Sequence, residues 1–103
     1  MKMLEYPVVI TRTEQGDDGI VTFPDFPDFE EMIEWKSADE MMRRCMTLLG
    51  LAYYLHVEEA GRPEPSASVF RPVSTARRVV GACRCNYDRF KELALQVKEF
   101  DLS

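Results

Sequence analysis

Hydrophobic and polar residues alternate at the start of the chain. The apolar positions of this run are Leu4, Tyr6, Val8 and Ile10. A period of two is typical of a strand with one buried face. Residues 14–19 are polar and suit the positive φ of a tight turn, and residues 20–23 return to apolar side chains. The pattern therefore predicts an antiparallel hairpin.

A proline-containing segment, Phe-Pro-Asp-Phe-Pro-Asp-Phe, follows at residues 23–29. Proline has no backbone N–H, so two prolines three positions apart exclude both a helix and a central strand here. We expect a kinked or edge segment with its two aspartates facing water. The side chains expected to pack against the core are Phe23, Phe26 and Phe29. Residues 31–36 then predict a third strand.

The next segment has the pattern of a long amphipathic helix over residues 38–60. Ser37 and Glu40 have the spacing of a capping box, which satisfies two backbone donors at a helix start. The apolar stripe comprises Met41, Cys45, Leu48, Ala52 and Leu55. Gly50 inside the helix indicates close packing against a neighbouring backbone. Gly61 suits the left-handed conformation that ends many helices.

The remaining residues predict a connection, a strand and a helix. Residues 62–78 are expected to cross the sheet or to reach another subunit. Residues 79–85 predict a fourth strand, and residues 87–100 predict a short final helix. The chain is thus expected to form a single α+β domain over residues 1–103. Its predicted elements are a three-stranded antiparallel sheet, a long helix, a fourth strand and a short C-terminal helix, in the order β-β-β-α-β-α.

Composition places the chain among folded cytoplasmic proteins. Of its 103 residues, 46% are hydrophobic, and no apolar run approaches the length of a membrane span. The first residues lack the apolar core of a signal peptide, so a cytoplasmic location is expected. Three cysteines, an odd number, fit a reducing compartment. Cys83 and Cys85 share one face of the predicted strand, so we expect them and Cys45 to be core residues.

The sequence offers little for catalysis. It has one histidine, His56, and it lacks a Gly-rich phosphate loop, a nucleophile elbow and a recognisable metal-ligand spacing. We therefore expect a protein without enzymatic activity, cofactor or metal.

Charge is unevenly distributed along the chain. Residues 1–66 carry 14 acidic and 6 basic side chains, whereas residues 67–103 carry 7 basic and 4 acidic ones. An acidic body repels phosphate and favours a basic protein as a partner. The arginines at positions 71, 77, 78, 84 and 89 could contact nucleic acid, but pairing with the surplus carboxylates is the favoured interpretation.

The order of these motifs resembles the HicB family of antitoxins. The matching parts are Tyr6, Gly19, Phe23-Pro24-Asp25-Phe26-Pro27, Ser37 to Glu40, and Pro63-Glu64-Pro65-Ser66. Together they cover residues 4–87. The chain departs from the family pattern at Asp28, at Trp35 and at Met41. Many family members carry a DNA-binding module after the fourth strand, but residues 86–103 are too short for one, so direct DNA binding is not expected.

The resemblance implies a partner, a small basic RNA-cleaving toxin of the HicA type, which the antitoxin neutralises by covering its active surface. The residues expected to bind the toxin are Asp25, Phe26, Asp28, Glu30, Glu31, Glu34 and Trp35, with Phe26 and Trp35 as apolar anchors. The residues alone explain the acidic cluster equally well as a solubilising guard on an exposed sheet edge. The resemblance favours docking.

Two other interpretations remain open. One is an orphan binding module that keeps the fold without a toxin, and the other is an RNA-binding or nuclease-like domain. The nuclease interpretation requires the carboxylates to converge on a metal ion.

Self-association is expected as well. The wide apolar surface of the 38–60 helix and the long 62–78 connection predict a homodimer or tetramer, with the C-terminal strand and helix at the interface.

Overall fold

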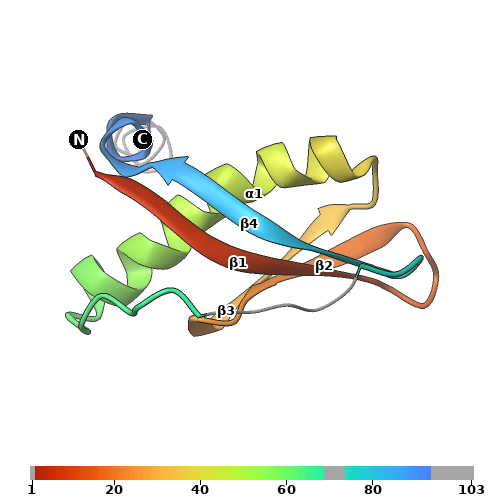
Figure 1. Cartoon of the computed structure of the whole chain (residues 1–103), viewed down its shortest axis with the longest axis horizontal. Coiled ribbons are helices and arrows are strands. Elements are labelled where there is room, and N and C mark those ends of the chain that lie inside the picture. The colour runs from red at the N-terminus through yellow and green to blue at the C-terminus, as the bar shows by residue number, and fades with distance from the viewer. Residues whose placement is uncertain (1, 69–73, 94–103) are drawn as a thin grey trace, which may run out of the picture.

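The computed structural model describes residues 2–68 and 74–93. An antiparallel four-stranded sheet, in the order β3-β2-β1-β4, is crossed on one face by a long helix (Figure 1). The strands are β1 (Met3–Arg12), β2 (Asp18–Phe23), β3 (Phe26–Glu34) and β4 (Arg78–Asn86). The helix α1 (Ala38–Tyr53) runs directly into η1 (Tyr54–Glu59), a π-helical stretch. The predicted α+β fold and its element order are confirmed.

The predicted final helix lies partly within the described residues. Residues 87–93 are helical, and the rest of the expected range, 94–100, lies outside the described residues. No described helix has both the length and the apolar character needed to cross a membrane.

Strand β1 is a central strand and is paired on both sides. It forms the predicted hairpin with β2, in which Val9 lies opposite Thr22, and it pairs with β4 along nearly its whole length. Strands β3 and β4 are therefore the two edges of the sheet. Gly16, in the turn between β1 and β2, has the positive φ of 84° that the polar turn sequence predicts.

Strand β3 begins earlier than the sequence predicts. We expected it to begin at Glu31 and to end at Lys36, but it runs from Phe26 to Glu34. The prediction treated Pro27 as part of a corner. Because β3 is an edge strand, a proline near its start is tolerated there. The pairing register between β2 and β3 shifts between Thr22 and Phe23, so the irregularity lies at the turn end of the β2–β3 hairpin.

The core lies between α1 and the sheet face that it covers. The largest fully buried side chains are Phe23, Phe26, Leu4, Ile10, Met41, Leu49, Val8, Val21, Cys45 and Cys83. Phe29 is partly buried against them. The predicted apolar stripe of the helix is confirmed except at its end, because Leu55 is 40% exposed. Leu55 lies in η1, where the wider π-helical turn changes which side chains face the sheet.

The predicted N-cap at Ser37 and the predicted conformation of Gly61 are confirmed. The Ser37 hydroxyl accepts a hydrogen bond from the backbone N–H of Glu40 at 3.3 Å and donates one to the Glu40 carboxylate at 3.2 Å. Gly61 has a φ of 65°, as its predicted role requires. Gly50 does pack closely, but against the ring of Phe90: a Cβ atom there would lie 2.6 Å from Phe90 Cδ2. The prediction of a neighbouring backbone was wrong.

Candidate functional site

The seven residues predicted to bind the toxin lie on β3 or directly beside it. They differ in what they contact, and they separate into three groups. Two carboxylates hold the segment after the helix, two aromatic side chains belong wholly or partly to the core, and three glutamates project from the sheet edge.

Asp25 and Asp28 bind the segment formed by residues 62–68, which we call the arm. The Asp25 carboxylate accepts hydrogen bonds from the backbone N–H of Ser68, at 3.1 Å, and from its hydroxyl. The Asp28 carboxylate pairs with the guanidinium of Arg62 at 2.5 Å. Both aspartates were predicted to bind a toxin, but in this structure they hold the chain's own arm beside the start of β3.

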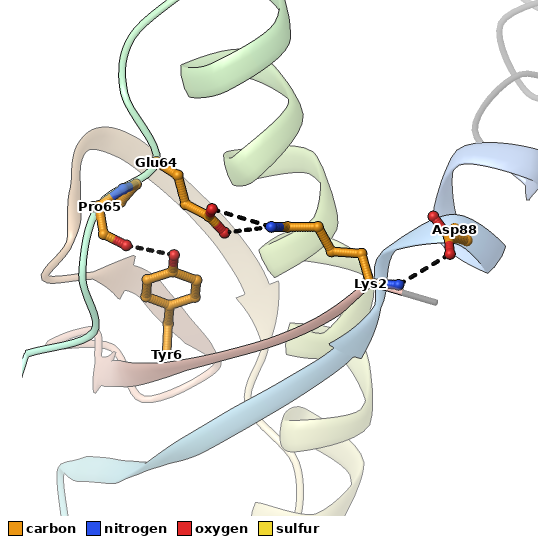
Figure 2. A network of polar contacts seen from close by, with 5 residues as sticks. All are labelled: Lys2, Tyr6, Glu64, Pro65 and Asp88. Carbon is orange, nitrogen blue, oxygen red and sulfur yellow. Dashed lines mark hydrogen bonds and ion pairs between the residues drawn. The ribbon is translucent and has the colours of Figure 1, made fainter.

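Further contacts hold the middle of the arm against β1 (Figure 2). The Tyr6 hydroxyl donates a 2.6 Å hydrogen bond to the carbonyl of Pro65, and the Lys2 ammonium pairs with the Glu64 carboxylate at 2.8 Å. Burial raises the pKa of Tyr6 to about 12, so this hydroxyl remains a donor at physiological pH. The hydrogen bond from Lys2 holds the pKa of the Glu64 carboxyl below its ordinary value.

Phe26 is not available as an interface anchor, contrary to the prediction. It is only 1% exposed, and its ring centroid lies 4.9 Å from that of Tyr6 and 5.3 Å from that of His56. Phe26 points toward α1, where its ring meets that of Tyr53, so the expectation that Phe26 packs against the core is confirmed.

Trp35 is half-buried and packs against the core. It lies over Gly19, where a Cβ atom would come within 3.0 Å of the indole ring. The Arg12 guanidinium lies over the Trp35 ring, 5.2 Å from its centroid. This cation–π contact occupies part of the surface that we had assigned to a partner.

The remaining three predicted residues, Glu30, Glu31 and Glu34, are exposed on β3. Glu30 and Glu34 lie on the open face of the sheet on either side of Met32, which is 59% exposed. Glu31 has the same parity as the buried Ile33 and lies on the α1 side. The alternation thus divides the carboxylates between both faces of one strand. Within the described ranges, no three His, Cys, Asp or Glu side chains are grouped to hold a metal ion.

The opposite edge of the sheet, β4, carries positive charge and is partly covered. Arg78 and Arg84 lie on the open face, and the Arg84 guanidinium pairs with Glu5 at 3.3 Å, as the favoured interpretation of the arginines predicted. The guanidinium of Arg77 instead donates to the carbonyl of Thr13. Arg71 lies outside the described residues.

Residues 74 and 75 fold back along the first part of β4. The backbone N–H of Val80 donates to the Ser74 hydroxyl at 3.1 Å, and Thr75 and Arg78 exchange backbone hydrogen bonds at 2.8 and 3.2 Å. We call these two residues the β4 hook. This feature was not predicted from the sequence, where its only signal is the Ser74-Thr75 pair, two residues away from the start of β4.

The three cysteines are buried and reduced, as predicted. Burial raises the pKa of the Cys45 thiol to about 11 and that of the Cys83 thiol to about 12. Neutral thiols of this kind are poor nucleophiles and poor metal ligands, so their chemistry is that of core residues.

No protein-family model matches this sequence, and a search of curated proteins found no match. The resemblance to HicB antitoxins therefore depends on the order and spacing of the short motifs described above.

Proposed function

We propose that this protein is a HicB-like antitoxin that binds a small basic RNA-cleaving toxin of the HicA type and covers its active surface. The observation that carries the proposal is the row of exposed carboxylates at Glu30, Glu31 and Glu34, placed along an open edge of the sheet. A toxin that holds RNA must present positive charge where the RNA lies, and an acidic edge can occupy the same place.

Charge and apolar contact have separate parts in this mechanism. The three glutamates attract and orient the basic partner during encounter, which mainly speeds association. Met32, exposed between two of them, offers apolar area that a partner can bury. The antitoxin carries out no chemistry itself, and neutralisation is a matter of steric and electrostatic exclusion of RNA in the cytoplasm.

The first experiment is a pull-down of the tagged protein from its native cell, with the bound protein identified by mass. A stoichiometric small basic protein is expected. Its affinity is then compared between the wild type, the double variant Glu30→Lys with Glu34→Lys, and the matched control Glu14→Lys with Glu92→Lys. Both variants change the net charge equally, and all four positions are exposed.

We expect the Glu30→Lys, Glu34→Lys variant to bind about 10- to 100-fold more weakly at low salt, or roughly 1.4–2.8 kcal/mol. The control variant should lose much less, because neither of its two glutamates lies on β3. Equal losses in both variants would indicate a net-charge effect only. Unchanged binding by the β3 variant in its folded state would refute the proposal.

The orphan-module interpretation predicts that the pull-down recovers only further copies of the chain. A nuclease-like activity would require carboxylates that converge. The described carboxylates of β3 point to different faces, and Asp25 and Asp28 are engaged by the arm. These contacts favour the docking interpretation over the nuclease interpretation.

A further inference from the structure

The backbone of β3 presents unpaired groups along its outer edge. The backbone N–H of Trp35 donates to the carbonyl of Asp17 at 2.9 Å, which fixes the phase of the β2–β3 ladder. In an antiparallel pair, hydrogen-bonded and non-hydrogen-bonded positions alternate. Residues 31 and 33 therefore bond to β2, whereas the N–H and C=O groups of Glu30, Met32 and Glu34 point away from the sheet.

No described residue covers these outward groups. The start of the edge is different, because Pro24 and Pro27 lack N–H groups and Asp28 is engaged by Arg62. The open part of the edge is thus the stretch from residue 30 to residue 34. This length matches a short added strand, the arrangement in which a peptide extends an existing sheet.

The side chains beside the open edge define the chemistry of such a strand. On the open face they are acidic, apolar and acidic in turn, at Glu30, Met32 and Glu34. Directly opposed opposite charges and apolar pairs stabilise neighbouring strands. A complementary segment therefore has Lys or Arg at positions i and i+4 and an apolar residue at i+2.

A second copy of this chain is a poor source of that segment. Its positively charged strand is β4, but the β4 hook already occupies the edge groups of Arg78 and Val80. As far as the described residues show, the outward groups near Ala82 and Arg84 remain, and this stretch is shorter than the open stretch of β3. A foreign basic segment has no such restriction.

We infer that β3 binds an extended basic segment of its partner as a fifth strand of the sheet, by backbone hydrogen bonds to Glu30, Met32 and Glu34. This inference rests on the proposed function and specifies how the acidic edge is used.

Substitution of Met32 by proline tests the inference. The Met32 N–H points outward, so Met32→Pro removes one edge donor and leaves both the β2–β3 ladder and the charge unchanged. The matched control, Met32→Thr, changes the same side chain and keeps the N–H. The probe is the peptide Thr-Lys-Thr-Val-Thr-Lys-Thr with blocked ends, titrated to several millimolar into the isotopically labelled protein and followed by amide chemical shifts and hydrogen exchange.

We expect the wild type and Met32→Thr to bind the peptide, with slower exchange at the amides of residues 30, 32 and 34. Met32→Pro, shown to be folded by its spectrum, should bind at least tenfold more weakly. Equal binding by the two Met32 variants would overturn strand addition, and so would an absence of peptide binding to the wild type. If Glu30→Lys with Glu34→Lys weakens binding of the protein partner as expected in that case, the proposed function survives and only the strand mode fails.

Discussion

At the scale of single residues, the contact between Gly50 and Phe90 shows how closely the helix and the C-terminal part of the chain are packed. Alanine normally stabilises a helix interior by about 1 kcal/mol relative to glycine. Here the added methyl group would overlap the Phe90 ring, which is only 9% exposed and has little room to move.

We therefore predict that Gly50→Ala lowers the free energy of unfolding by about 1–2 kcal/mol, because the destabilisation from overpacking exceeds the stabilisation from the higher helix propensity of alanine. The measurement is urea denaturation at equilibrium. In a Phe90→Ala background, where the ring is absent, the same substitution should become neutral or stabilising. A stabilising effect of Gly50→Ala in the wild-type background would contradict the packing described here.

The direction of individual side chains was the least predictable property of the site. The spacing of Phe23, Phe26 and Phe29 predicted three core contacts, yet Phe26 was also predicted to be an apolar anchor for the toxin. Only the position of the β2–β3 turn decides which way Phe26 points. The exposure of Glu30 and Glu34, by contrast, follows from charge and alternation alone and was predicted correctly.

At the scale of elements, the arm is held by contacts of two kinds. The donor of the hydrogen bond to the Pro65 carbonyl is Tyr6, which is only 5% exposed. The Lys2–Glu64 ion pair instead joins side chains that are 42% and 43% exposed. Exposed ion pairs contribute little to stability because solvent screens them. The hydrogen bond from Tyr6 is therefore expected to contribute more to the stability of the arm than the Lys2–Glu64 ion pair does.

We predict that Tyr6→Phe destabilises the protein by about 1 kcal/mol and speeds amide exchange in residues 64–68, because it leaves the Pro65 carbonyl without its donor. Glu64→Gln should have a smaller effect on both quantities. Since the pKa of Glu64 is lowered in the folded state, its contribution is present above the ordinary pKa of a glutamate and is lost as the pH falls through the lowered value. Equal effects of the two variants at neutral pH would show that the arm is held by charge.

The elements themselves followed largely from local signals in the sequence. The alternation of apolar and polar residues predicted β1 and β2, and the Ser37 cap predicted the start of the helix. The start of β3 was misplaced because residues 23–29, expected to form a kinked or edge segment, were not counted as part of the third strand, whereas an edge strand tolerates a proline. Neither the π-helical η1 nor the β4 hook was predicted. The hook is closed by hydrogen bonds between residues three and six positions apart, and the Ser74-Thr75 pair was its only local signal.

At the scale of the whole molecule, the two sheet edges carry opposite charge, with glutamates on β3 and arginines on β4. Copies that joined β3 to β4 would form a head-to-tail array, which closes only when the rotation between copies completes a ring. A two-fold contact between two β4 strands closes instead. The register of β4 on β1 directs the N–H and C=O groups of Ala82 and Arg84 outward, as that contact requires.

We propose that the protein is a homodimer through this part of β4 and the adjoining helix, and we predict that Ala82→Pro converts it to a folded monomer. Ala82→Thr, which keeps the outward N–H, should remain dimeric. Light scattering at high micromolar concentration measures the outcome. A monomeric wild type would refute the dimer, and a dimeric Ala82→Pro variant would place its interface elsewhere.

The central position of β1 also affects the order in which the protein folds during synthesis. Because Met3 pairs with Asn86 and Thr11 with Arg78, one whole side of β1 stays open until the ribosome has delivered the last described strand. Before then the nascent chain can form only the β1–β2–β3 meander and α1, and the strand that supplies Val8 and Ile10 to the core is itself an exposed edge. The newly made protein is therefore most prone to wrong pairing between neighbouring chains in the interval before β4 emerges, and the completed sheet removes that risk from β1.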